Sequence, residues 1–283
     1  MPSCHKPLSH NGTGLDFPYI AQIKYDGNML YVIVRQGIAK FFTSGWKEID
    51  FSGYTPFSNS PSGVYFIEVT NGVGKLGDRQ KIGFLTTMRT RTAKNLPNDE
   101  FFPGFKIFDY VTLDDWYLEH SALGYRARLE LIASRFAPEA FTVFSYVHDY
   151  IGLSSLMANL KSGGWEGLVL RKPDSFWLGT GKRNLDCLKL KHMETYDLRV
   201  VSEVPGTRRL TGKMGSLMLE DAEGRYVGSV GTGFDDSERV VGKYIGKVIE
   251  VKCERVSKDR VLIQPVFVSV REEKELDTIV KGA

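Results

Sequence analysis

The chain has 283 residues, of which 42% are hydrophobic and 25% are charged. This composition excludes a disordered or fibrous protein and leaves room for one large domain or two smaller ones, and we expect two. The formal net charge of +3 permits a polyanionic partner without requiring one.

The cysteines and the first residues bear on the compartment. Cys4, Cys187 and Cys253 stand apart without CxxC spacing, so neither a zinc site nor a disulfide framework is indicated and a reducing compartment fits. The first residues, MPSCHKPLSHNGTG, lack the apolar stretch of a signal peptide, and no run reaches the roughly 18 apolar residues of a membrane span. We therefore expect a cytoplasmic protein without membrane contact.

Short apolar runs bounded by Gly, Pro and Asn dominate the first two thirds of the chain. They predict strands over residues 19–24, 28–35, 38–43, 63–70, 105–111, 142–147, 166–171 and 186–191. Tyr125, Leu129, Ile132 and Phe136 recur at helical spacing and predict a helix over 125–137, with Arg126, Arg128 and Arg135 on its solvated face. A second helix is expected over 152–161, ended by Gly163-Gly164.

The sequence pattern changes after about residue 193, where shorter predicted strands alternate with regularly spaced turn residues. Five short strands with one interposed helix over roughly 235–245, capped by Asp235, Asp236 or Ser237, favour a small barrel of the OB type. An SH3-like barrel or a small sandwich would leave a similar pattern. We place the domain boundary so that residues 1–193 form the first domain and residues 194–283 the second.

Charged and aromatic residues interrupt several predicted strands in a particular order. The chain reads KYDG at Lys24, FIEV at Glu68 and FKIFDY at Phe108-Asp109, then EGLVLR at Glu166 and LKLK at Lys189 and Lys191. Any one of these is ordinarily a solvated charge or a core aromatic. Their order and approximate spacing are similar to the motifs of the covalent nucleotidyltransferases, and the chain resembles an ATP-dependent DNA ligase of minimal, two-domain form.

Two further segments extend this resemblance to nearly the whole chain. VFVSVREEK, residues 266–274, looks like the motif that closes the OB domain of DNA ligases and capping enzymes, and GTGFDDSE, residues 231–238, resembles the turn before its helix. The implied fold class is α+β: a nucleotidyltransferase (adenylation) domain of mixed or antiparallel sheets, followed by a C-terminal OB-fold barrel. The implied activity is the sealing of nicks between a 5′-phosphate and a 3′-hydroxyl through lysyl-AMP.

The resemblance also assigns roles to residues. Lys24 would be the nucleophile toward ATP and Phe108 the platform on which adenine stacks. Lys24 must lose its proton to attack, and Lys189 and Lys191 with a metal ion would favour the neutral amine and neutralise the α-phosphate. Glu68 would contact the ribose or a metal, and Glu166 would help hold Mg²⁺. The remaining residues implied in nucleotide binding are Ile23, Arg271 and Lys274, of which the last two would orient the pyrophosphate.

This chain departs from the family pattern at three positions. Met29 stands where DNA ligases usually carry an arginine, Ser44-Gly45 replaces Ser-Arg, and Arg171 replaces a lysine. The missing cations could come from neighbouring strands, from Arg35, Lys40 or Lys47. Asp26 and Gly27 would shape the loop after the nucleophile, with the glycine allowing a positive φ and a close approach of the backbone.

The expected partner is nicked double-stranded DNA, bound by a monomer. Two basic stretches, residues 75–95 and 205–215, suit contacts to phosphates. Compact ligases of this kind resemble those of phages and some bacteria, so a phage-encoded chain would act in the host cytoplasm. Two alternatives stay open: an RNA ligase or mRNA guanylyltransferase of the same superfamily, and a non-catalytic ligase relative that only binds nucleic acid.

Overall fold

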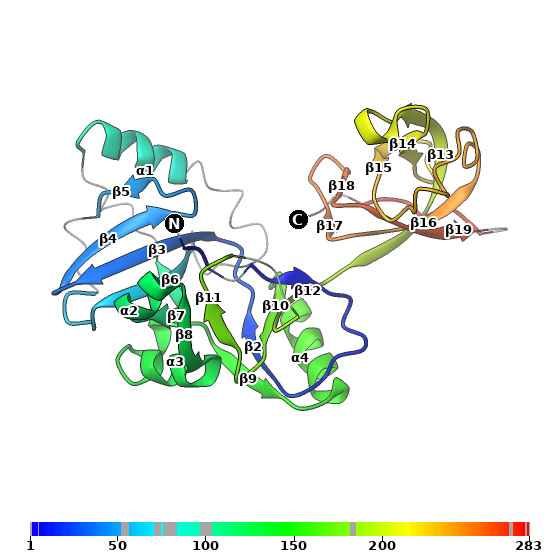
Figure 1. The fold of residues 1–283 in the computed structure, drawn as a ribbon. Coiled ribbons are helices and arrows are strands. Elements are labelled where there is room, and N and C mark those ends of the chain that lie inside the picture. The colour runs from blue at the N-terminus through cyan, green and yellow to red at the C-terminus, as the bar shows by residue number, and fades with distance from the viewer. Residues whose placement is uncertain are drawn as a thin grey trace. The chain divides into compact units, whose positions relative to one another are not determined.

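The fold comes from a computed structural model that describes residues 2–4, 6–51, 57–70, 75, 84–96, 104–181, 185–271, 274–280 and 282. The chain divides into two compact units, Met1–Lys191 and His192–Ala283 (Figure 1). The division lies two residues before the predicted boundary. No helix among the described residues is long and apolar enough to cross a membrane.

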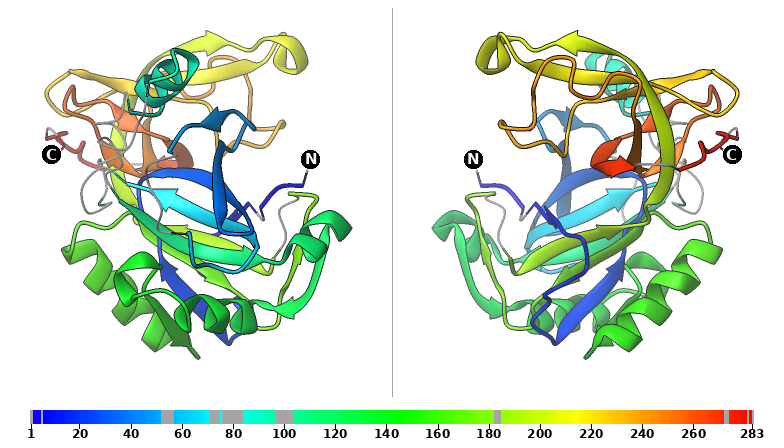
Figure 2. Two further views of the ribbon diagram at one scale, coloured as in Figure 1. Left: turned by 90° about the vertical axis from the view of Figure 1, so that its left-hand side faces the viewer. Right: turned by 90° about the vertical axis from the view of Figure 1, so that its right-hand side faces the viewer.

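One sheet of the first unit has the strand order β1-β12-β10-β2-β9. Its apolar side chains alternate along the strands, so that Ala21, Leu168 and Leu190 share one face. That face packs against Leu153 and Leu160 of α4 (Tyr150–Ser162). Figure 2 shows the green helices along the outer side of the sheets. The strands are β1 (Leu8–Ser9), β12 (Cys187–Lys191), β10 (Gly167–Arg171), β2 (Tyr19–Ile23) and β9 (Phe144–Val147).

The second sheet of this unit is antiparallel, in the order β5-β4-β3-β6-β7. Leu129 and Ile132 of α3 (Tyr125–Ala133) pack in the core on one face. Trp116 of α2 (Leu113–Leu118) packs with Tyr31 and Phe66 on the other face. The strands are β5 (Glu48–Ile49), β4 (Ile38–Thr43), β3 (Asn28–Arg35), β6 (Gly63–Val69) and β7 (Phe105–Val111), and the smaller elements are α1 (Phe84–Ala93), η3 (Pro138–Ala140) and the pair β8 (His120–Gly124) and β11 (Phe176–Leu178).

The eight strands predicted for this unit are present with ends shifted by at most two residues, and both predicted helices form. One expectation about α3 is wrong. Arg126 and Arg135 are exposed as predicted, but Arg128 is only 1% exposed. Its position lies three residues after buried Tyr125 and one before buried Leu129, which places it on the core side of the helix.

The second unit is a five-stranded antiparallel sheet in the order β15-β14-β13-β16-β19. Its core gathers alternate residues of these strands around Tyr244 and Phe267. The strands are β13 (Glu194–Pro205), β14 (Met214–Glu220), β15 (Tyr226–Val230), β16 (Val248–Cys253) and β19 (Val266–Arg271), joined by η4 (Arg208–Leu210) and the pair β17 (Arg255–Val256) and β18 (Leu262–Ile263).

The helix predicted over 235–245 is not formed. These residues, all described by the structure, make consecutive turns. Gly242 and Gly246 have φ values of 77° and 79°, which lie in the left-handed region that an α-helix excludes. Val240, Val241 and Ile245 are exposed, and Tyr244 is the one apolar side chain over 235–245 that is buried, so the segment lacks the apolar stripe that would hold a helix against the sheet.

Candidate active site

A cavity of about 280 Å³ lies within the first unit and is lined by residues of both sheets. Lys24 and Ile23 come from the end of β2 and Arg171 from β10, while Met29, Glu68 and Phe108 come from β3, β6 and β7. The cavity therefore brings together four of the predicted site residues, Ile23, Lys24, Glu68 and Phe108.

Lys24 is held at one end of this cavity by an ion pair with Glu166. Its Nζ lies 2.5 Å from Glu166 Oε2, and Lys191 Nζ lies 2.8 Å from Glu166 Oε1. Burial disfavours the charged carboxylate, but the attraction of Lys24 and the hydrogen bonds from both lysines outweigh it and hold the pKa of Glu166 below its ordinary value. One buried carboxylate thus fixes two ammonium groups.

The three predicted lysines share one face of the first sheet. The backbone N–H of Lys24 donates to Gly167 O at 2.9 Å, and Gly167 pairs with Lys191 across β10 and β12. Lys189 lies two residues before Lys191 and opposite Val169, a cavity residue. Because side chains alternate along a strand, Lys189 and Lys191 lie on the same side of the sheet as Lys24.

Glu68 and Met29 bring the second sheet into the lining of the cavity. They are directly opposed in the antiparallel register of β3 and β6, and both line the cavity. A Cβ at Gly27 would lie 2.4 Å from Val69 O and 2.9 Å from Glu68 Cγ. Gly27 does not have a positive φ, so the prediction on that point is wrong. A glycine is required here because the loop after Lys24 passes against β6.

Phe108 reaches the cavity through a bulge in β7. Phe66 pairs with Asp109 and Ile67 pairs with Ile107, which leaves Phe108 as an extra residue. Its ring packs in the same cluster as Phe66 and Trp116. The bulge therefore supplies an aromatic wall of the cavity.

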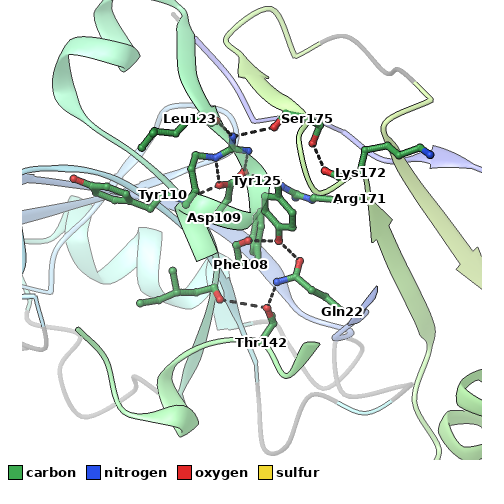
Figure 3. A network of polar contacts seen from close by, with 12 residues as sticks. Gln22, Phe108, Asp109, Tyr110, Leu123, Tyr125, Thr142, Arg171, Lys172 and Ser175 are labelled. Carbon is green, nitrogen blue, oxygen red and sulfur yellow. Dashed lines mark hydrogen bonds and ion pairs between the residues drawn. The ribbon is translucent and has the colours of Figure 1, made fainter. Parts of the chain in front are cut away.

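Asp109, the next residue, anchors a buried cluster of two arginines (Figure 3). Arg128 Nε donates to Asp109 Oδ1 at 2.8 Å, and Arg171 Nη1 donates to Oδ2 at 2.7 Å. The Arg171 guanidinium lies 5.5 Å from the Phe108 ring centroid. Burial raises the pKa of Asp109, but the two arginines more than reverse this and leave it below its ordinary value. The ion pairs of the cluster are buried in the core, and its Arg171 guanidinium packs near the Phe108 ring.

A second set of hydrogen bonds fixes the backbone at Phe108 (Figure 3). The hydroxyl of Tyr125 donates to Phe108 O at 2.7 Å and also contacts Gln22 Oε1. Gln22 Nε2 donates to Thr142 Oγ1. Burial raises the pKa of Tyr125, so the hydroxyl keeps its proton. Gln22 and Thr142 also line the cavity, so these hydrogen bonds connect its lining to the bulge.

Comparison with known proteins bears on this arrangement. Residues 205–271 match the family described as DNA ligase OB-like domain. A DNA ligase of Methanococcoides burtonii (strain DSM 6242 / NBRC 107633 / OCM 468 / ACE-M) is 30% identical over 209 residues, 61% of this chain and 36% of the relative. Over these ranges the chain is similar to DNA ligases. It spans about a third of the length of this curated DNA ligase.

Solved structures of DNA ligases show the same fold across both units. Pmar-Lig_PreS3 is 21% identical with a TM-score of 0.73, over 95% of this chain and 67% of that one. A Lig E DNA ligase, described as binding DNA with a minimal scaffold, is 20% identical with a TM-score of 0.68 over 96% of this chain and 100% of that one. The fold class is therefore confirmed: α+β, with mixed sheets followed by an OB-like domain.

Two of the residues that the resemblance to DNA ligases assigns belong to the second unit. Arg271 Nη2 lies 2.9 Å from Glu250 Oε2, and Lys274 is exposed. Of the two predicted basic stretches, residues 76–83 lie outside the described part of the chain, and residues 84–93 form α1. In the other stretch, Arg209 pairs with Asp236 while the Arg208 side chain is exposed.

Sequence reasoning on DNA-ligase motifs missed part of the cavity. None of Arg35, Lys40 and Lys47 lines it; Arg35 contacts Tyr117 and Lys40 pairs with Glu48. Instead, Arg171 and Lys6 line the cavity and bring positive charge to it. Lys6 precedes the first predicted strand. Helical spacing on α3 would have placed Arg128 beside Tyr125, but nothing in the sequence indicates that Arg128 pairs with Asp109 of the FKIFDY motif.

The carboxylates suit a metal ion that arrives with a nucleotide. The described residues contain no group of three or more His, Cys, Asp or Glu side chains that could hold a metal. Glu68 and Glu166 are hard oxygen donors beside the cavity, and Mg²⁺ is commonly held by one or two carboxylates together with phosphates and water. The donor set therefore fits a magnesium nucleotide.

Proposed function

We propose that the protein is an ATP-dependent DNA ligase that seals nicks between 5′-phosphate and 3′-hydroxyl ends through a covalent lysyl-AMP intermediate. The observation that carries the proposal is the position of Lys24. It stands in a cavity walled by an aromatic ring, and its ammonium is fixed by the same carboxylate that holds Lys191. The order of the motifs along the chain and the fold of both units support the same reaction.

In the first step, Lys24 Nζ attacks the α-phosphorus of ATP. A nitrogen–phosphorus bond forms, the bond to pyrophosphate breaks, and the two protons lost by the ammonium pass to water. Glu166 accepts hydrogen bonds from Lys24 and Lys191, so it orients the nucleophile while Lys191 keeps a positive charge beside it. Lys189 and Lys191 stabilise the charge that develops on the α-phosphate.

Phe108 and Met29 provide walls for the nucleotide. Adenine stacks on the Phe108 ring, which the Asp109 cluster supports, and Glu68 hydrogen-bonds the ribose. Glu68 and Glu166 would hold the Mg²⁺ that accompanies ATP, and its charge would neutralise phosphate oxygens. Arg271 and Lys274 orient the leaving pyrophosphate. AMP then passes to the DNA 5′-phosphate, and the 3′-hydroxyl displaces it.

The DNA partner is nicked duplex, bound by a monomer through phosphate contacts. Exposed Arg208 and the basic residues of α1 supply such contacts, and the affinity should fall steeply with salt concentration. Nicks left by repair, replication or recombination are the implied substrates. Three free cysteines suit the reducing cytoplasm where such DNA occurs.

The test is covalent labelling. The protein, first treated with pyrophosphate to remove bound AMP, is mixed with Mg²⁺ and ATP labelled on the α-phosphate, then denatured and examined for label. We expect label on the unmodified chain, none on Lys24→Ala, and full label on Lys40→Ala, which removes a lysine from an exposed ion pair. Labelling by GTP instead of ATP would indicate a guanylyltransferase, and label with neither would leave a binding protein.

A second assay identifies the polynucleotide. The labelled protein is offered nicked DNA, nicked RNA and a nicked RNA–DNA hybrid, each carrying a 5′-phosphate. Sealing of nicked DNA supports the proposal. Sealing confined to RNA 3′-hydroxyl ends would make the protein an RNA ligase.

A further inference from the structure

The segment before β2 forms a wall of the cavity. Cys4, Lys6 and Pro7 line it together with Lys24. Ser3 N donates to Gly179 O at 2.8 Å on one side. On the other side, β1 pairs in parallel with β12, with Ser9 opposite Lys189. The segment (Figure 1, dark blue) is thus hydrogen-bonded to the rest of the unit at Ser3 and at β1.

Lys6 is the cation of this wall. Its side chain is exposed, and it makes no hydrogen bond or ion pair with the part of the chain that the structure describes. Among the described residues of the lining, the other two cations are each paired with a carboxylate, Lys24 with Glu166 and Arg171 with Asp109. Lys6 therefore offers the cavity a positive charge that forms no ion pair with the described residues, Glu68 of the same lining included.

Met29 explains why such a charge is needed. It lines the same cavity opposite Glu68, and its thioether offers an anionic ligand neither a charge nor a strong hydrogen bond. A nucleotide carries several negative charges, and an ammonium is an effective point charge for phosphate. Because β1 is hydrogen-bonded beside the strand that carries Lys189 and Lys191, the position of Lys6 is fixed relative to those lysines.

We propose that Lys6 is a nucleotide-binding residue whose ammonium contacts a phosphate oxygen of the bound nucleotide and supplies, from the N-terminal segment, the charge that Met29 does not. This inference rests on the proposed function for the identity of the nucleotide. It adds the segment around β1 to the site, although this segment precedes every motif of the resemblance.

Calorimetric binding of ATP tests the inference without requiring chemistry. The binding is measured for Lys6→Ala, Lys6→Arg, Met29→Arg and the double variant Lys6→Ala/Met29→Arg. We expect Lys6→Ala to raise the dissociation constant about tenfold, as loss of one charge-assisted contact would, Lys6→Arg to restore most of it, and Met29→Arg to rescue the alanine variant. Lys172→Ala is the matched control, since Lys172 pairs with Asp16 and does not line the cavity.

Labelling of the same proteins separates the two proposals. If the unmodified chain is labelled by ATP but Lys6→Ala binds ATP as tightly as the unmodified chain, the inference about Lys6 is overturned and the proposed function stands. If Lys6→Ala weakens binding but the unmodified chain takes no label, the nucleotide contact stands and the ligase reaction is overturned. A chain that binds no ATP overturns both. Unchanged thermal unfolding of Lys6→Ala confirms that the fold is intact.

Discussion

Lys24 Nζ lies 2.5 Å from Glu166 Oε2 although the two residues are 142 positions apart in the sequence. The contact exists because β2 and β10 are antiparallel neighbours, which places the end of one beside the start of the other. The bond from Lys24 N to Gly167 O fixes this register at the site itself.

Replacing Glu166 by Gln should lower the rate of lysyl-AMP formation by roughly a hundredfold or more. The amide keeps the shape of the carboxylate but removes the charge that holds two ammonium groups, and general positioning and acid–base roles contribute on this order. Single-turnover labelling with ATP measures the rate. Glu48→Gln, which removes a carboxylate from an exposed ion pair, is the control, and an equal loss in both variants would contradict the assigned role.

Replacing Phe108 by Ala should raise the ATP concentration needed for half-maximal labelling by about tenfold, which corresponds to about 1.4 kcal/mol of lost stacking. Phe108→Trp should retain most of the affinity because it keeps an aromatic face. Phe176→Ala, which removes an exposed ring outside the cavity, should leave the half-maximal concentration unchanged. If Phe108→Ala lowers only the maximal rate, the ring is not a stacking platform.

Replacing Arg128 by Met should destabilise the first unit by about 3–5 kcal/mol, as expected when one partner of a buried ion pair is removed. The change leaves Leu123 O and Ser175 O without the donor that reaches them at 2.6 and 3.1 Å. Chemical denaturation followed by near-ultraviolet circular dichroism measures the loss. Arg126→Met, on the exposed side of the same helix, should change the free energy of unfolding by less than about 0.5 kcal/mol.

The stability of the first unit should fall as the pH drops below about 4.5, the ordinary pKa of a glutamate. The pKa values of Glu166 and Asp109 are both lowered in the folded chain. Their contribution is therefore fully present above the ordinary values of 4.5 and 3.8 and is lost as the pH falls through the lowered ones. Thermal unfolding between pH 6 and pH 3 tests this.

The variants Glu166→Gln and Asp109→Asn provide the comparison for this pH dependence. Each should show a shallower fall of the melting temperature than the unmodified chain, because the amide does not titrate. Parallel curves for the variants and the unmodified chain would show that other carboxylates control acid unfolding.

The strands were predictable from the sequence because alternation and short apolar runs report burial directly. The site was predictable only in part. The resemblance of KYDG and EGLVLR to ligase motifs predicts roles for Lys24 and Glu166. The pairing of β2 with β10, however, is a long-range relationship that the local sequence pattern does not contain. Gln22 and Thr142 are ordinary polar residues in predicted strands, and only the fold links them, through Tyr125, to the Phe108 backbone.

The failure over 235–245 has a local cause. The segment contains the capping residues of a helix, but Gly242 and Gly246 adopt positive φ and keep it in turns. Neither a strand or helix pattern nor a motif in the sequence pointed to Lys6. It belongs to no predicted element and reaches the cavity through the pairing of β1 with β12.

The bulge in β7 makes two adjacent residues serve the same side of the sheet. In a regular strand Phe108 and Asp109 would point to opposite faces. Deleting one residue between 105 and 108 would remove the bulge and straighten the strand. Either the Phe108 ring would then turn away from the cavity, or the Asp109 carboxylate would turn away from both arginines. Because one inserted or deleted residue changes the direction of Phe108 or Asp109 completely, homologous chains should preserve the length of this strand more strictly than the identity of its side chains.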